Sequence, residues 1–198
     1  MIIGFVGKIA SGKSEAARYI KKEYGFGTCK FSSVLREVLD SLYLDQTREN
    51  LTKLSESLRG KFGEDILSKV VVERVKGQKN MVVEGIRRKK DIKYLKDNPN
   101  FVLASISTDE KIRYNRIKDR KENEDDFNKS FEEFKQDQKL STEVTIPEVI
   151  NIADEDIKIC SNPIMDNFYT LPNCISHPQR DIFGIDNYTF SFPEQINL

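Results

Sequence analysis

The sequence has few cysteines and a single histidine, which argues against a disulfide framework or a zinc site. Cys29, Cys160 and Cys174 are widely separated and form no repeated pair, so we expect three reduced thiols. His177 follows Cys174 closely, and together they supply at most two metal ligands. The His-x-Glu and Pro-Cys-x-x-Cys elements of zinc-dependent nucleotide deaminases are missing, which excludes that chemistry.

Long apolar runs and a net charge are also absent. No uninterrupted hydrophobic stretch is long enough to cross a bilayer. The first residues lack the basic flank and the long apolar stretch of a secretory signal, so a cytoplasmic location without membrane association is expected. Lys plus Arg and Asp plus Glu number 32 each. The chain therefore has no overall positive charge that would attract nucleic acid. A small anionic partner bound by a few arginines agrees better with this charge balance. No pattern in the sequence indicates an oligomeric state.

Strand-like and helix-like segments alternate along the chain, whose 198 residues suit one main domain. Residues 2–6 are apolar and rich in β-branched side chains, as in a strand buried on both faces of a parallel sheet. Residues 13–23 have helical apolar spacing, and Gly25 follows as a stop. The remaining predicted strands cover 26–31, 81–83, 101–107 and 157–159, and the remaining predicted helices cover 34–44, 66–75, 109–121 and 127–140. This alternation predicts an α/β fold built from parallel β-α-β units with right-handed crossovers.

The segment from Gly7 to Ser14 has the spacing of two glycines, a lysine and a hydroxyl residue that defines a P-loop. It follows a predicted strand and precedes a predicted helix, which is the context that the motif requires. The glycines allow backbone N–H groups to turn toward phosphate oxygens, and the helix presents its positive N-terminal end to the same charge. The sequence therefore predicts a site for the phosphates of ATP.

The side chains of this loop have expected roles in phosphoryl transfer. Lys13 is expected to bridge the β- and γ-phosphates and to act in catalysis. The Ser14 hydroxyl is expected to ligate Mg²⁺, so ATP and Mg²⁺ are the predicted cofactors. The residues expected to contact the nucleotide are Gly7, Lys8, Ala10, Ser11, Gly12, Lys13, Ser14, Glu15 and Arg120.

A carboxylate and an arginine follow the predicted strand 81–83. Glu84 lies at the carboxyl end of that strand, where the ligand crevice of an open α/β sheet lies. It is a candidate metal ligand beside Ser14 and a candidate catalytic residue, although a charged residue at a strand end is also common. Arg87 can reach a phosphate in the same crevice, because its planar guanidinium matches phosphate oxygens. Arg87 is therefore a candidate for catalysis and for acceptor binding.

Further arginines are candidates for binding phosphates. Arg113, Arg116 and Arg120 recur at i, i+3 and i+7, so they share one helix face. This face is either a set of guanidinium groups that close over the transferring phosphates, with Arg116 and Arg120 catalytic, or a solvated surface paired with nearby acidic residues. Arg36 and Arg59 are weaker candidates for binding the phosphate of the acceptor.

These motifs resemble the nucleoside monophosphate kinases and the related dephospho-coenzyme A kinase-like proteins over about residues 1–162. Residues 7–14 match their phosphate loop, and residues 33–37 and 84–87 resemble their acceptor-side helix and their acidic-Gly-x-(Pro)-Arg segment. Residues 116–120 are similar to the paired arginines of their lid, and residues 153–157 to the Ala-Asp that introduces their last strand. The resemblance implies a P-loop NTPase three-layer sandwich of about five parallel strands flanked by helices. It also implies short helical insertions on the acceptor side and in a lid at about 113–135.

The resemblance implies an ATP-dependent kinase that moves the γ-phosphoryl group to a small phosphorylated acceptor. True dephospho-coenzyme A kinases have an Asp-x-Asp where this chain has Phe-Ser-Ser at 31–33, so a nucleoside or deoxynucleoside monophosphate is the preferred acceptor. Residues 163–198 form a separate extension that contains most of the prolines and many aromatic residues. This extension keeps a second hypothesis open, a nucleotide-binding regulatory or interaction module without transfer activity. A dephospho-coenzyme A kinase-like enzyme is the third hypothesis.

Overall fold

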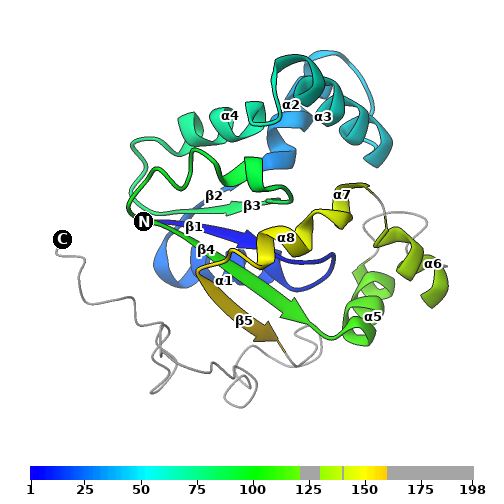
Figure 1. Cartoon of the computed structure of the whole chain (residues 1–198). Helices are drawn as coiled ribbons and strands as arrows, with labels where there is room; N and C mark the ends of the chain where they lie inside the picture. Colours follow the sequence, from blue (N-terminus) through cyan, green and yellow to red (C-terminus); the bar gives the residue numbers. More distant parts are fainter. Residues whose placement is uncertain (121–129, 140, 160–198) are drawn as a thin grey trace, which may run out of the picture.

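A computed structural model describes residues 1–120, 130–139 and 141–159, without the side chains at positions 119, 120, 137, 141 and 142. A five-stranded parallel sheet with the strand order β2-β3-β1-β4-β5 forms its centre (Figure 1). The strands are β1 (Ile2–Val6), β2 (Gly27–Lys30), β3 (Met81–Glu84), β4 (Phe101–Thr108) and β5 (Glu155–Ile159). The prediction of about five parallel strands flanked by helices is confirmed.

Helices cover both faces of the sheet. They are α1 (Lys13–Tyr24), α2 (Phe31–Ser41), α3 (Arg48–Phe62), α4 (Ile66–Val75), the 3-10 helix η1 (Lys89–Ile92), α5 (Glu110–Arg120), α6 (Phe131–Asp137), α7 (Ser141–Val144) and α8 (Ile146–Ile150). Helix α1 packs on one face, and α2, α4 and α8 pack on the other (Figure 1). Helices α2 and α3 occupy the region predicted to be the acceptor-side insertion, and α5 and α6 border residues 121–129 of the predicted lid.

Strand β1 lies in the middle of the sheet because its side chains alternate between two apolar cores. Ile2 and Val6 belong to the core beneath α2, α4 and α8, whereas Ile3 and Phe5 belong to the core beneath α1. All five residues of β1 are buried, and burying one such large side chain stabilises a fold by roughly 1.5–3 kcal/mol. This central position fixes the residues after Val6 at the carboxyl edge of the sheet, where ligands bind in open α/β folds.

Helix α2 begins earlier than the sequence predicts. The predicted helix started at residue 34, but α2 starts at Phe31 and Lys30 occupies the N-cap position. The Ser33 hydroxyl donates to the Lys30 carbonyl at 2.7 Å instead of capping an amide. Phe31 is buried in the core, so packing of this aromatic side chain extends the helix toward β2.

Helix α6 is shorter than the predicted helix 127–140. Ser130 and Glu133 form a reciprocal capping box, in which the Ser130 hydroxyl accepts from the Glu133 amide at 3.2 Å and the Glu133 carboxylate accepts from the Ser130 amide at 2.7 Å. This Ser-x-x-Glu pattern is a helix start, so the helix begins at Phe131. The sequence prediction overlooked it.

The final strand is longer than predicted and joins β4 through Asp154. The Asp154 amide donates to the Leu103 carbonyl at 2.8 Å, and its carboxylate accepts from the Leu103 amide at 2.8 Å. This aspartate therefore sets the start of β5, which runs from Glu155 rather than from residue 157. Cys160 and the predicted extension 163–198, which contains Cys174 and His177, lie outside the described residues.

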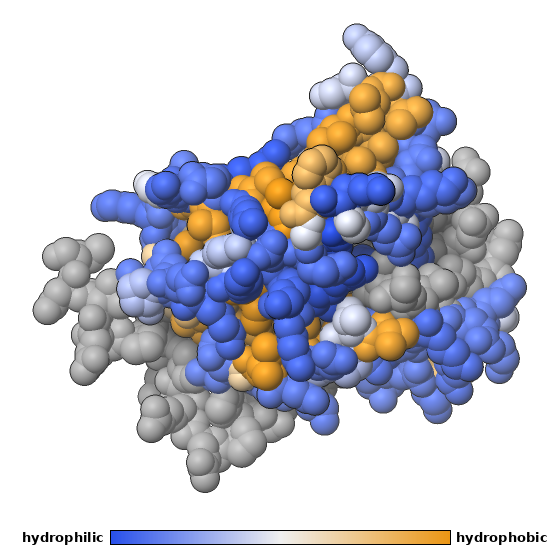
Figure 2. Space-filling model, turned by 45° about the horizontal axis from the view of Figure 1, so that its top comes forward, coloured by the Kyte–Doolittle hydropathy of each residue, from blue (hydrophilic) through white to orange (hydrophobic). Residues whose placement is uncertain are grey.

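The face of the molecule in Figure 2 is mostly hydrophilic, and hydrophobic atoms gather near its upper right. Exposed large hydrophobic side chains of the described residues include Leu42, Tyr43 and Leu44 in the turn between α2 and α3, and Phe62 at the end of α3. Within the described part of the chain, no helix is both long and apolar enough to span a membrane.

Candidate active site

The phosphate loop connects β1 to α1 at the carboxyl edge of the sheet (Figure 1). Gly12 is the N-cap of α1 and has φ 103°, a backbone conformation that glycine adopts without strain. A Cβ atom at Gly7 would lie 2.3 Å from the Ile106 carbonyl oxygen, which leaves no room for a side chain. Both glycines of the motif are therefore required by the local geometry, as the P-loop interpretation expects.

Replacing Gly12 by alanine should weaken both the fold and nucleotide binding. The added Cβ would lie 2.9 Å from Ile159 Cδ1 at a φ that disfavours alanine, so we expect a loss of stability of at least about 1 kcal/mol. Gly60 in α3 is a matched control, because a Cβ there meets nothing within 4 Å and alanine favours a helix. Thermal denaturation with and without Mg-ATP measures both effects. A Gly12→Ala protein as stable and as responsive to Mg-ATP as the Gly60→Ala protein would contradict this expectation.

Lys13 is held at the mouth of the loop. Its ammonium group donates to the Gly7 carbonyl at 2.7 Å and to the Lys8 carbonyl at 2.8 Å. Both acceptors belong to the loop itself, so the charge is already directed toward the space that the loop surrounds. A bound polyphosphate would offer this ammonium group stronger, charged acceptors in place of the two carbonyls.

Ser14 and Glu84 meet as the sequence predicts for a metal-ligating pair. The Ser14 hydroxyl donates to Glu84 Oε2 at 2.8 Å, although the two residues are 70 positions apart. Glu84 is 5% exposed, and its Oε1 lies 3.4 Å from the ammonium group of Lys30. A hydroxyl and a carboxylate beside a phosphate loop fit Mg²⁺, which binds through few protein oxygens and completes its shell with water and phosphate oxygens.

Three consecutive carbonyls of the phosphate loop accept hydrogen bonds from the end of β4 and from α5. Arg113 Nη1 donates to the Ile9 carbonyl at 3.4 Å, and Arg116 Nη1 donates to the Ala10 carbonyl at 3.1 Å. The Thr108 hydroxyl donates to the Ser11 carbonyl at 2.8 Å. We call these three donors the loop clamp. The clamp therefore engages these three carbonyls from the side of the loop that faces the end of β4 and helix α5.

The clamp arginines are buried rather than solvated. Arg113 is 3% exposed and Arg116 is 4% exposed. Burial lowers the pKa of both guanidinium groups, yet arginine remains charged because its ordinary pKa lies far above neutral pH. The alternative of a solvated surface therefore does not describe these two side chains. The side chain of Arg120, the third arginine of the predicted face, lies outside the described residues.

Arg87 lies after β3, and its environment includes a carboxylate that the sequence analysis did not consider. Its Nη1 is 3.7 Å from Glu143 Oε1, and the arginine side chain is 45% exposed. The Thr145 hydroxyl donates to the Arg87 carbonyl at 2.8 Å, which connects this segment to the turn between α7 and α8. Arg87 is thus available to a ligand at the carboxyl edge of the sheet.

Arg36 and Arg59, the two weaker candidates for binding the phosphate of the acceptor, lie in different environments. Arg36 is exposed and donates to the Gln46 side chain at 2.8 Å. Arg59 is 5% exposed and pairs with Asp91 at 2.6 Å. Because the contacts of Arg59 are internal, the structure supports a positioning role for this residue rather than direct contact with an acceptor.

The Arg59–Asp91 pair connects helix α3 to the segment that carries Arg87. Arg59 also donates to the Glu64 carbonyl at 2.5 Å. The second oxygen of Asp91 accepts from the backbone amides of Arg87 and Arg88, each at 2.9 Å. One buried carboxylate therefore fixes the backbone of the segment that carries Arg87 and the position of helix α3 at the same time.

Four residues of this edge were missed from the sequence. Thr108 directly follows the predicted strand 101–107 and ends β4 in the structure, so its position at the carboxyl edge was a usable signal. Lys30 ends another strand next to Glu84 in the sheet register, which was also a usable signal. Asp91 and Glu143 lie in segments whose packing the sequence does not indicate, and only the structure brings them to the site.

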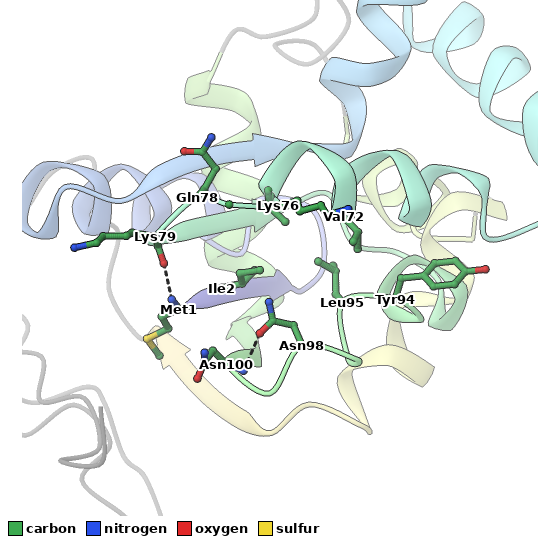
Figure 3. Close-up of a pocket in the computed structure, with 12 residues that line it drawn as sticks. Met1, Ile2, Val72, Lys76, Gln78, Lys79, Tyr94, Leu95, Asn98 and Asn100 are labelled. Carbon is green, nitrogen blue, oxygen red and sulfur yellow. Dashed lines mark hydrogen bonds between the residues drawn. The ribbon is translucent and has the colours of Figure 1, made fainter. Parts of the chain in front are cut away.

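A hollow at the opposite edge of the sheet is separate from this site (Figure 3). Its lining includes Met1, Ile2, Lys79 and Asn98, which lie where β1, β3 and β4 begin. The amino group of Met1 donates to the Lys79 carbonyl at 2.6 Å. The phosphate loop follows the other end of β1, so this hollow is not part of the candidate active site.

Comparison with known proteins assigns the family. A family model described as an AAA domain (AAA_17) matches residues 6–135. A UPF0200 protein of Methanoculleus marisnigri is 31% identical over 127 residues, which is 63% of this chain and 69% of the relative. The chain belongs to this AAA domain family and to the UPF0200 proteins. A UPF0200/UPF0201 protein of Archaeoglobus fulgidus is 32% identical over 159 residues, or 77% of this chain, and the match spans only 48% of that relative.

Solved structures place this UPF0200 member among the P-loop kinase folds. The shikimate kinase of Bacteroides thetaiotaomicron superposes with a TM-score of 0.58 at 11% identity, covering 84% of this chain and 90% of that chain. At this identity the likeness concerns the fold alone. The narrower resemblance to nucleoside monophosphate kinases and dephospho-coenzyme A kinases remains a prediction.

Proposed function

We propose that this UPF0200 member transfers the γ-phosphoryl group of ATP to a small phosphorylated acceptor, with a nucleoside or deoxynucleoside monophosphate as the first candidate. The observation that carries the proposal is the phosphate loop with Lys13 at its mouth and the Ser14–Glu84 pair beside it. Two arginines, Arg87 in the segment after β3 and Arg116 in α5, lie toward the same edge of the sheet.

The chain's residues would catalyse transfer by holding charges in place. Amides of the loop and Lys13 bind the β- and γ-phosphates, and Arg87 offers a partly exposed guanidinium to the acceptor. Arg116 acts through the loop, because its Nη1 is bonded to the Ala10 carbonyl. Ser14 and Glu84 would hold Mg²⁺, which supplies neutralisation of phosphate charge when bound. Glu84 is also positioned to accept a proton near the reacting phosphate. Arg120 remains a proposed nucleotide contact.

An acceptor panel tests this proposal. ADP release would be measured with Mg-ATP alone and with each of the common nucleoside and deoxynucleoside monophosphates, dephospho-coenzyme A and shikimate. A kinase of the proposed type shows ADP release that depends on one or more monophosphates. Release stimulated only by dephospho-coenzyme A or shikimate would reassign the acceptor. Binding of ATP without stimulation by any acceptor would instead support a regulatory nucleotide-binding module.

A further inference from the structure

Glu143 is a buried carboxylate between the acceptor-side and lid-side parts of the molecule. It belongs to α7, which lies beyond the ends of β3 and β1 and between α3 and α5 in Figure 1. The residue is 7% exposed. Its Oε2 atom is buried and accepts no hydrogen bond in the described part of the chain. Its other oxygen, Oε1, is 3.7 Å from Arg87 Nη1, which is longer than a hydrogen bond.

This arrangement is unfavourable for a residue that only supports the fold. Buried polar atoms in native proteins nearly always have hydrogen-bond partners, and leaving an ionised one without a donor is costly. A structural carboxylate would be expected to bond both oxygens, as Asp91 does with Arg59 and two backbone amides. Glu143 contrasts with Asp91 at the same edge of the sheet, so its second oxygen points to a donor supplied by a ligand.

The groups around Glu143 locate that ligand in the acceptor region. Arg87 on one side follows β3 and is partly exposed. Burial lowers the pKa of Arg113, and the charges of Glu110 and then of Glu143 oppose that lowering. Arg113 in turn donates to the Ile9 carbonyl of the phosphate loop. Glu143 therefore lies between the loop that would hold ATP and the arginine that would hold the acceptor.

Building on the proposed phosphotransferase function, we infer that Glu143 recognises the acceptor by accepting a hydrogen bond from one of its hydroxyl or amino groups. Arg87 binds an anionic group of the same molecule. The ligand class is a small anion that carries hydroxyl or amino donors. Nucleoside monophosphates and hydroxy acids share this chemistry. Because Oε2 is not exposed, the Glu143 side chain turns toward the ligand as it binds.

Two variants and one control separate recognition from structural support. Glu143→Gln keeps the shape and removes the charge, and Glu143→Met keeps the length and removes the acceptor atoms. Glu148→Gln is the matched control, because Glu148 lies on the neighbouring helix α8 in an exposed pair with Lys89. Each protein would be tested by thermal denaturation alone, with Mg-ATP, and with each of AMP, GMP, CMP, UMP, dTMP and shikimate in the absence of ATP.

The expected result has three parts. The Glu143→Met protein melts at the wild-type temperature or above it, because a buried carboxylate oxygen without a donor has been removed. The stabilisation by Mg-ATP is unchanged. The midpoint concentration of the stabilising acceptor rises roughly 10-fold or more in both Glu143 variants, and it stays unchanged in Glu148→Gln.

Other outcomes overturn the inference. A clear fall in melting temperature for both Glu143 variants, with acceptor binding retained, would show that Glu143 stabilises the fold and does not contact the acceptor. Failure of every panel compound to stabilise the wild-type protein would reject the ligand class. The test does not depend on turnover. A wild-type protein that binds a panel compound through Glu143 but transfers no phosphate would refute the proposed function and leave this inference standing.

Discussion

Replacing Lys13 by alanine is expected to reduce acceptor-dependent ADP release by about 100-fold to 1000-fold or more, because a charge aimed at the transferring phosphate is removed. The fold should persist, since Lys13 is at the start of α1 and its ammonium group donates to the Gly7 and Lys8 carbonyls of the phosphate loop rather than packing in either apolar core. Steady-state ADP release measures the effect on turnover. Circular dichroism and thermal denaturation show whether the fold is retained.

Lys21→Ala is the matched control for Lys13→Ala. Lys21 is on the same helix and is exposed, so its loss changes the net charge equally without touching the loop. Its activity should stay close to that of the wild type. Full activity of the Lys13→Ala protein on the same acceptor would remove the basis of the proposed function.

The second large effect is expected at the buried Arg59–Asp91 pair. Arg59→Met leaves the Asp91 carboxylate buried without its charged partner, and breaking a buried ion pair in this way costs about 3–5 kcal/mol. For a chain of this length each kcal/mol lowers the melting temperature by roughly 2–4 °C. We therefore expect a decrease of about 10 °C, measured by differential scanning calorimetry.

Two further variants make the Arg59 result interpretable. Arg59→Lys retains the charge and should lose less stability than Arg59→Met. Arg74→Met removes a surface ion pair between Arg74, which is 33% exposed, and Glu37, which is 60% exposed. This change should have little effect on the melting temperature, because exposed ion pairs contribute little to stability. Equal, small changes in melting temperature for Arg59→Met and Arg74→Met would show that the Arg59–Asp91 pair does not hold helix α3 in place.

The parts of the fold that the sequence predicts are those governed by local pattern. The span of α4 matches the predicted helix 66–75 at both ends, because apolar periodicity and a following turn define it. The phosphate loop is predicted residue by residue, since its two glycines, Lys13 and Ser14 lie at fixed spacing within residues 7–14 and their chemistry is specific. The Ser14–Glu84 contact follows as well, because parallel strands bring their carboxyl ends to one edge.

The parts that the sequence does not predict depend on tertiary packing. Nothing local distinguishes Arg59, which is buried against Asp91, from Arg36, which is exposed. The spacing of Arg113 and Arg116 identifies a shared face, but not that this face contacts the carbonyls of the phosphate loop. Glu143 lies in a helix of only four residues, too short for any periodicity to show which way its side chain points.

The loop clamp has a thermodynamic consequence for nucleotide binding. Three carbonyls of the loop are already engaged from outside by Thr108, Arg113 and Arg116, so the intervening peptide units have little rotational freedom left to lose. A loop whose backbone is already ordered loses less conformational entropy on binding phosphate than a flexible loop does. For the proposed ATP site, affinity would therefore depend on Thr108, Arg113 and Arg116 through their bonds to the loop carbonyls, so that β4 and α5 would influence nucleotide binding from outside the loop.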